Sequence, residues 1–192
     1  MQLTVLPLTP ARWPDLETLF HAKGCSEARG CWCMCYRHSG SRGPLPAGTT
    51  QAQASRSELK ALVDSSRPPG LIGYQGKLPV GWVSLGPRED FAKLKRSPVM
   101  KAVDDQPVWS LVCFVVPLQY RGQGVARALL DGAMAYAKKR GVKLLEAYPV
   151  DKPGRSKDDL MWFGAKSMYD AAGFQEVARR KPQRPVVRIH PV

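Results

Sequence analysis

The stretch from Phe114 to Leu130 constrains the fold more than any other part of this chain. It begins with apolar, β-branched residues, passes through a turn that contains Gly122 and Gly124, and continues with the small and apolar residues of a helix start. Glycines let the backbone turn tightly with bare N–H groups, and a helix start adds unpaired N–H groups and a positive dipole end. The stretch therefore predicts a strand, a turn and a helix that form a cradle for a phosphate group.

Two common phosphate-binding motifs do not match this turn. The dinucleotide fingerprint has the spacing G-x-G-x-x-G and an acidic residue about 20 positions later, and the Walker loop has Gly-Lys followed by Ser or Thr. Neither pattern is present in the sequence. The cradle is therefore expected to belong to another class of phosphate-binding protein.

Length and composition predict one domain. The 192 residues, 44% of them hydrophobic, suffice for one substantial core but not for two, so we expect residues 1–192 to form a single domain. The first ten residues lack the pattern of a signal peptide, and no run approaches the roughly 18 apolar residues that span a bilayer. A cytoplasmic protein without a membrane partner is the expectation. Five cysteines, an odd number, favour reduced thiols over a complete disulfide framework.

The net charge of +13 suits an anionic partner. One cluster of cations, between Lys138 and Lys143, follows a predicted helix, where positive charge complements the dipole. A second, between Arg179 and Arg184, flanks a predicted hairpin turn and is typical of a solvated sheet edge. Because no zinc-finger, ribonucleoprotein or basic-zipper pattern accompanies them, a nucleic-acid partner is not expected.

Apolar periodicity predicts a mixed α/β fold, with a mixed central β-sheet flanked by helices on both sides. The expected strands are Gln2–Leu6, Leu71–Tyr74, Leu78–Leu85, Val108–Val116, Lys143–Val150, Phe174–Arg179 and Pro185–Ile189. The expected helices are Asp15–Ala22, a helix capped by Thr49 or Thr50 that runs to Asp64, Glu89–Lys95, Val125–Gly141 and Ala165–Ala172. Irregular connections are expected at Gly24–Gly48 and Asp151–Asp159. The strand Val108–Val116 is almost wholly apolar, which predicts a position at the centre of the sheet.

Two motifs resemble the GNAT superfamily of acyl-CoA-dependent N-acyltransferases. Arg121-Gly-Gln-Gly124-Val-Ala126 fits its pyrophosphate loop R/Q-x-x-G-x-G/A, and the overlapping frame that starts at Gln119 fits as well. The frame at Arg121 is preferred because it places Val116 five residues upstream. About 45 residues later, Tyr169-Asp-Ala-Ala-Gly173-Phe174 is similar to the Tyr-x-x-x-Gly-Phe signature that closes the core of this superfamily. The resemblance covers Val108–Phe174 specifically and implies the GNAT fold for the whole domain.

The resemblance implies an N-acetyltransferase that moves an acetyl group from acetyl-CoA to an amine, directly and in a ternary complex. The backbone of Phe114, Val115 and Val116 would hold the pantetheine arm like an added strand. The pyrophosphate would lie on Arg121, Gly122, Gln123, Gly124, Val125, Ala126 and Arg127. Tyr169 would protonate the departing thiolate, although a buried tyrosine that only packs its ring is a common alternative.

Amine acylation also needs a group that removes a proton from the ammonium. Glu146 is the one carboxylate within the otherwise apolar run Leu144–Ala147, and some members that resemble this chain place a base at the matching strand position. Pairing with one of the many cations, or a position near a sheet edge, is an equally good explanation of Glu146. Asp104, Asp105 and Asp151 are lesser candidates. Asp151 stands where the superfamily often has Asn, so one coenzyme contact is in doubt.

The most unusual local feature is the cysteine-rich segment, with Cys25 followed by Cys31-Trp32-Cys33-Met34-Cys35. Structural zinc sites have wider spacing, so a metal site is not expected. A covalent cysteine relay is not expected either, because no histidine is placed as a base for the thiol, and a packed thiol-rich segment is the simpler interpretation. It resembles a GNAT subgroup that carries Cys-Trp-Cys-Met. Because the region between the first helices borders the acceptor pocket in the GNAT fold, Trp32, Tyr36 and Arg37 are candidate substrate-binding residues.

A small-molecule or peptide amine is thus the expected acceptor, of an identity that the sequence does not specify. Two alternatives stay open: a GNAT-shaped module that binds acyl-CoA or an anionic partner without catalysis, and a metal or redox sensor built on Cys25–Cys35. The basic charge favours neutral or acidic acceptors over polycationic ones.

Overall fold

A computed structural model describes residues 3–40, 43–65, 67–153 and 161–191. Its centre is a seven-stranded sheet with the order β1-β2-β3-β4-β5-β7-β6. The strands are β1 (Thr4–Pro7), β2 (Gly70–Gln75), β3 (Leu78–Pro87), β4 (Trp109–Val115), β5 (Leu145–Ala147), β6 (Gln175–Lys181) and β7 (Arg184–Ile189). Neighbours pair antiparallel except β4 and β5, which are parallel. The predicted mixed sheet is confirmed, and β4 occupies its centre.

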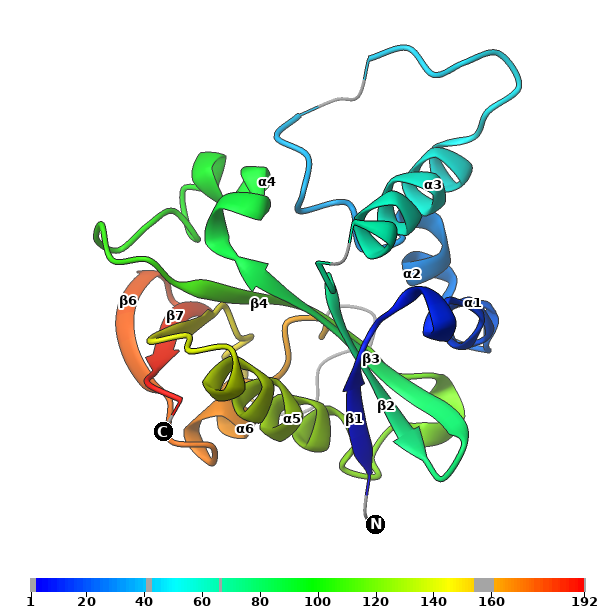
Figure 1. The fold of residues 1–192 in the computed structure, drawn as a ribbon. Coiled ribbons are helices and arrows are strands. Elements are labelled where there is room, and N and C mark those ends of the chain that lie inside the picture. The colour runs from blue at the N-terminus through cyan, green and yellow to red at the C-terminus, as the bar shows by residue number, and fades with distance from the viewer. Residues whose placement is uncertain (1–2, 41–42, 66, 154–160, 192) are drawn as a thin grey trace.

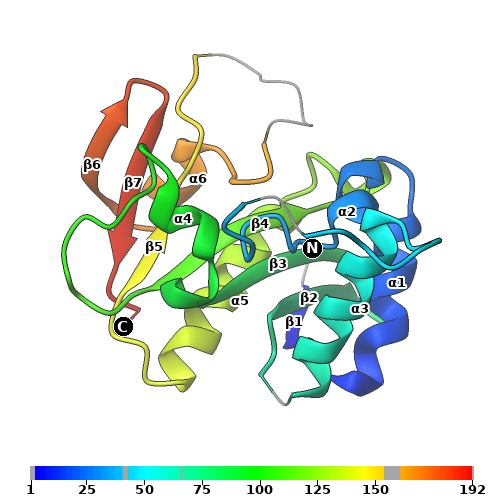
Figure 2. The ribbon, with the colours of Figure 1, turned by 90° about the horizontal axis from the view of Figure 1, so that it is seen from above.

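Helices cover both faces of the sheet (Figures 1 and 2). They are α1 (Trp13–His21), α2 (Ser26–Cys31), α3 (Gln51–Asp64), α4 (Ala92–Arg96), α5 (Val125–Lys139) and α6 (Lys166–Asp170), with single 3-10 turns η1 (Pro10–Arg12), η2 (Arg88–Asp90) and η3 (Leu118–Tyr120). Helices α1, α2, α3 and α4 lie on one face, and α5 and α6 lie on the other. This arrangement agrees with the predicted layers.

Local sequence explains the helix boundaries. Thr50 and Gln53 form a reciprocal capping box at the start of α3, as expected from a threonine at that position. Helix α5 starts after Gly124 and is followed by the left-handed Gly141. Helix α2 was not expected within the predicted irregular connection Gly24–Gly48, because its six residues are too short a run to show a helical period. It is held by tertiary packing, since Ala28 and the following Trp32 are buried in the core.

Strand β5 is shorter than the predicted Lys143–Val150, because Pro149 lacks the N–H group that a ladder requires. Val150 makes only an isolated parallel bridge to Ala165. As a result, β4 pairs with β5 only through residues 109–111 and 145–147, and the two strands separate beyond them. The predicted insertion Asp151–Asp159 lies largely outside the described residues. No helix among the described residues is long and apolar enough to cross a membrane.

Candidate active site

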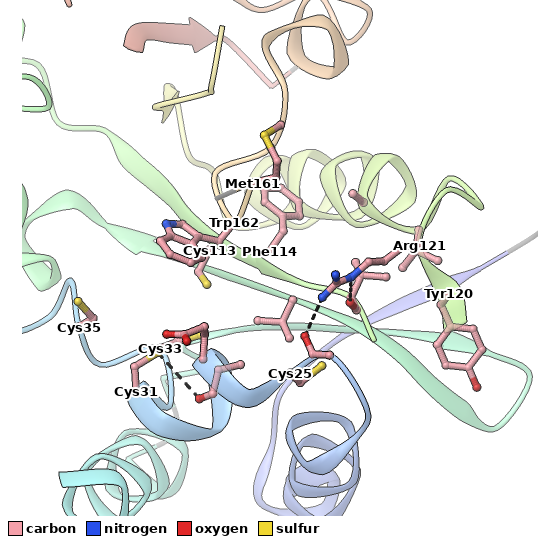
Figure 3. Close-up of a pocket in the computed structure, with 18 of the residues that line it drawn as sticks. Cys25, Cys31, Cys33, Cys35, Cys113, Phe114, Tyr120, Arg121, Met161 and Trp162 are labelled. Atoms are coloured by element: carbon pink, nitrogen blue, oxygen red, sulfur yellow. Dashed lines mark hydrogen bonds between the residues drawn. The ribbon is translucent and has the colours of Figure 1, made fainter. Parts of the chain in front are cut away.

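A cavity of about 570 Å³ lies where the end of β4 meets the start of α5 (Figure 3). One wall comes from α2 and the turn that follows it, and the opposite wall comes from residues 161, 162 and 164. The floor is β4 from Cys113 to Val115. The cavity thus joins segments that are far apart in the sequence, and it contains most of the predicted cofactor-binding residues.

The glycine turn forms one end of the cavity. Gly122 and Gly124 have φ values of +73° and +81°, in the left-handed region that favours glycine. A Cβ atom at either position would meet no atom within 4 Å, so the turn is an open cradle. Gly124 caps α5 without a side-chain hydrogen bond, and the first helical residues Val125–Arg127 line the cavity. The N–H groups and dipole of α5 therefore suit an anion at this end.

Arg121 holds the turn in place. Its Nε donates to the carbonyl oxygen of Val116 at 3.0 Å, and its Nη2 donates to that of Gly24 at 2.7 Å (Figure 3). The guanidinium group therefore links the turn to β4 and to the segment before α2. Of the predicted loop residues, Gln123 is not part of the cavity wall, and its side chain donates to the carbonyl oxygen of Gln119.

The segment Met161–Gly164 lies beside the free edge of β4. The N–H group of Phe114 donates to the carbonyl oxygen of Trp162 at 2.7 Å, and the hydroxyl group of Tyr169 donates to that of Phe163 at 2.9 Å. The predicted pantetheine contact at Phe114 and the predicted proton donor Tyr169 are therefore both bonded to consecutive carbonyl groups of this segment.

Tyr169 is fully buried between the rings of Phe114 and Phe174. Burial raises the pKa of Tyr169 above its ordinary value, so the hydroxyl group keeps its proton at neutral pH. Tyr169 does not line the cavity. Its hydrogen-bond acceptor, Phe163, lies in the chain between Trp162 and Gly164, and both of these residues line the cavity. The predicted proton donor thus lies directly behind the wall.

The carboxylate of Glu146 is hydrogen-bonded on both oxygens, unlike the carboxylate of a base that is free to accept a proton from a substrate. The Glu146 carboxylate is fully buried and accepts hydrogen bonds from Arg88 at 2.7 Å, Arg188 at 2.8 Å and Tyr148 at 2.6 Å. Arg188 also donates to Asp104 at 2.7 Å. Glu146 is not part of the cavity wall. This geometry favours the alternative that Glu146 pairs with cations.

Glu27, on α2, is the only acidic residue among the described residues of the cavity wall, and it is solvent-exposed. The lesser candidates Asp104, Asp105 and Asp151 do not line the cavity, and Asp151 pairs with Arg179 at 2.8 Å. Nothing in the local sequence distinguishes Glu27 from other surface carboxylates, so it was missed.

All five cysteines of the chain line this one cavity. Figure 3 shows Cys25 at the end near Arg121 and Cys35 at the opposite end, with Cys31, Cys33 and Cys113 between them. The turn after α2 makes this possible, because Trp32 and Cys33 both adopt left-handed φ values, +47° and +52°. Such strained non-glycine residues are uncommon and occur mainly at functional sites.

The thiols of Cys31 and Cys33 stay protonated at neutral pH. The pKa of Cys31 is raised by a hydrogen bond with Cys33 and by burial, and that of Cys33 is raised chiefly by its hydrogen bond with Cys113. The indole Nε1 of Trp82 donates to the sulfur of Cys33 at 3.3 Å. Cys35 is solvent-exposed, and the ammonium group of Lys93 lies 3.2 Å from its sulfur. None of the five cysteines forms a disulfide bond.

Among the described residues, no group of three or more His, Cys, Asp or Glu side chains has a geometry that could hold a metal ion. The prediction that no metal is required stays a prediction.

Only one of the three predicted substrate-binding residues lines the cavity. Tyr36 does, whereas Trp32 is buried in the core and stacks on Trp13 with ring centroids 5.6 Å apart. Arg37 contacts a separate hollow, where its guanidinium group lies 4.5 Å from the ring centroid of Phe91 and 3.6 Å from Asp90. The sequence placed these side chains on one segment, but the left-handed turn directs them into different surroundings.

The parallel strands β4 and β5, an open glycine turn and a helix start meet at one cavity of this α/β protein, and this arrangement suits a phosphate-bearing ligand. The chain belongs to the GNAT acetyltransferase family, whose model, "Acetyltransferase (GNAT) family", matches residues 28–156. The predicted family and fold are confirmed. The resemblance to a Cys-Trp-Cys-Met subgroup stays a prediction.

Solved structures share this fold at low sequence identity. The polyamine N-acetyltransferase of Drosophila melanogaster, which forms N-acetylagmatine, is 14% identical with a TM-score of 0.57, and the match covers 98% of this chain and 100% of that one. An acetyltransferase of Thermus thermophilus is 18% identical with a TM-score of 0.53, over 99% and 97% of the two chains. The PaiA N-acetyltransferase of Thermoplasma acidophilum, in complex with coenzyme A, is 14% identical with a TM-score of 0.53, over 99% of each chain. No curated protein sequence matches this chain.

Proposed function

We propose that residues 1–192 form one N-acetyltransferase domain that transfers an acetyl group from acetyl-CoA to a small amine. The observation that carries this proposal is the open cradle of Gly122 and Gly124 at the start of α5, beside the free edge of β4. The coenzyme A complex of the PaiA enzyme and the amine substrates of the Drosophila enzyme support the donor and acceptor classes. A cytoplasmic location, where acetyl-CoA and reduced thiols occur together, is part of the proposal.

The residues present fit the donor. The N–H groups from Gly122 to Arg127 would hold the pyrophosphate, and the part of β4 that does not pair with β5 would hold the pantetheine arm by strand addition. This requires the N–H group of Phe114 to exchange its bond with the Trp162 carbonyl for one with the donor. When bound, acetyl-CoA supplies an activated acetyl thioester. The protein then contributes mainly by positioning, which can supply about 7–11 kcal/mol in favourable cases.

Two residues would manage the protons. Tyr169, kept protonated by burial, would donate a proton to the departing sulfur after releasing the carbonyl oxygen of Phe163. Glu146 was the predicted base, but its two arginine partners and its distance from the cavity wall leave it poorly suited. We propose Glu27 instead as the carboxylate that faces the ammonium group of the acceptor, directly or through water.

The direct test is acetylation itself. Purified protein, acetyl-CoA and single amines would be incubated, and acetylated amine would be quantified by mass spectrometry, because the five free thiols interfere with thiol reagents. Acetylated product that forms in proportion to protein would support the proposal. Acetyl-CoA binding without product from any amine would instead support the non-catalytic module.

Tyr169→Phe is expected to lower kcat about a hundredfold, the lower range for loss of a general acid, while the Kd of acetyl-CoA stays within twofold. The substitution keeps the buried ring and removes only the hydroxyl group. Tyr120→Phe is the matched control, because Tyr120 also lines the cavity but lies at the phosphate end. An unchanged kcat in Tyr169→Phe would show that the tyrosine only packs the core.

A further inference from the structure

The part of the cavity away from the glycine turn has an unusual wall. It is lined by Cys31, Cys33, Cys35, Tyr36, Cys113 and Trp162, so it combines thiols with aromatic rings. We call these six residues the thiol-aromatic wall. Because the donor would fill the end near Arg121, the acceptor amine must contact this wall. The class of amine inferred from the wall rests on the proposed function.

Two thiols and the phenol of the thiol-aromatic wall are uncharged at neutral pH. The thiols of Cys31 and Cys33 stay protonated, and burial raises the pKa of Tyr36 to about 12. Neutral thiols and aromatic rings favour apolar and aromatic surfaces, and sulfur atoms contact ring edges favourably. A second ammonium group placed against this wall would lose its hydration without gaining a counter-charge.

Among the described residues that line the cavity, one is acidic and three are basic. Glu27 is the only carboxylate among the described residues of the cavity wall, so it can balance one ammonium group. Lys93 lines the cavity too, and its ammonium group lies 3.2 Å from the sulfur of Cys35 and 5.2 Å from the centroid of the Tyr36 ring. The face of the Tyr36 ring, which could attract a substrate cation, already has the protein's own cation. A second positive charge on the acceptor would therefore be repelled.

We propose that the acceptor is a monoamine on an aromatic body, with its ammonium group at Glu27 and its ring against the thiol-aromatic wall. Diamines and polyamines are disfavoured because the described part of the cavity wall has one carboxylate and carries the ammonium group of Lys93 beside the thiol-aromatic wall.

The test compares kcat/KM for phenethylamine and tryptamine with that for putrescine and agmatine, using the full chain and acetyl-CoA. The aromatic monoamines are expected to be at least about tenfold better substrates, as one unfavourable charge contact costs about that factor. A preference for putrescine or agmatine would overturn this inference and leave the proposed function intact. If no amine were acetylated although acetyl-CoA bound, the proposed function would fail, and this inference with it.

Charge reversal at the cavity gives an independent measurement. Lys93→Glu is expected to lower the ratio of kcat/KM for phenethylamine to kcat/KM for putrescine about tenfold, because it replaces the repelling cation with a second carboxylate. Lys95→Glu is the matched control: Lys95 is an exposed residue of the same helix, α4, that does not line the cavity. Equal preferences in both variants would show that only the overall charge matters, which would contradict the assigned position of the acceptor.

Discussion

Glu146→Gln is expected to lower the free energy of unfolding by about 3–5 kcal/mol, the range for breaking a buried ion pair from one side. The fully buried carboxylate balances the guanidinium groups of Arg88 and Arg188 and accepts the hydroxyl hydrogen bond of Tyr148. Glutamine keeps the size of the side chain but leaves both cations without its negative charge. Urea unfolding at pH 7 measures the change.

Glu176→Gln is the control for this experiment, because Glu176 pairs with Arg179 at 2.6 Å on the solvated strand β6. Removing one exposed ion pair is expected to change stability by about 0–1 kcal/mol. If Glu146→Gln also lowered the free energy of unfolding by less than about 1 kcal/mol but removed the basic limb of the pH–rate profile, Glu146 would be the base that the sequence suggested. The stability loss and the rate loss thus separate the two roles.

Gly124→Glu is expected to weaken acetyl-CoA binding about a thousandfold, or about 4 kcal/mol. The substitution puts a bulky anion into the open space at the start of α5, where several charge-assisted hydrogen bonds to the pyrophosphate would form, each contributing roughly 1.5–3 kcal/mol. Calorimetric titration of wild type and variant with acetyl-CoA measures the loss.

Gly141→Glu is the matched control for Gly124→Glu. Gly141 follows the other end of α5, has a φ of +71° against +81° for Gly124, and likewise has no atom within 4 Å of an added Cβ. Both variants therefore carry a similar backbone strain of about 1–2 kcal/mol, but only Gly124 lines the cavity. Equal loss of binding in both variants would show that strain, and not the cradle, explains the effect. Wild-type protein that is folded but does not bind acetyl-CoA would contradict the donor assignment.

Local sequence determined the phosphate cradle. The glycines at 122 and 124, the apolar strand before them and the helix after them act through backbone conformation and period, which depend on neighbouring residues. The same holds for the central position of β4, because a strand that is apolar on both faces must be covered on both faces. The family could be predicted from these features and from Tyr169-x-x-x-Gly173-Phe174.

Only the tertiary structure decided which side chains surround the cavity. The apolar strand around Glu146 suggested a catalytic base. In the fold, Arg88 and Arg188, which are 58 positions before and 42 positions after Glu146, balance the charge of its carboxylate. Five cysteines spread from position 25 to 113 converge because α2 packs beside β4, and Lys93 reaches Cys35 from a different helix. Local sequence patterns do not predict these contacts, because the contacts form between residues that are far apart in the sequence. That is why the glycine turn could be predicted from the sequence, whereas the charged groups that line the cavity required the fold.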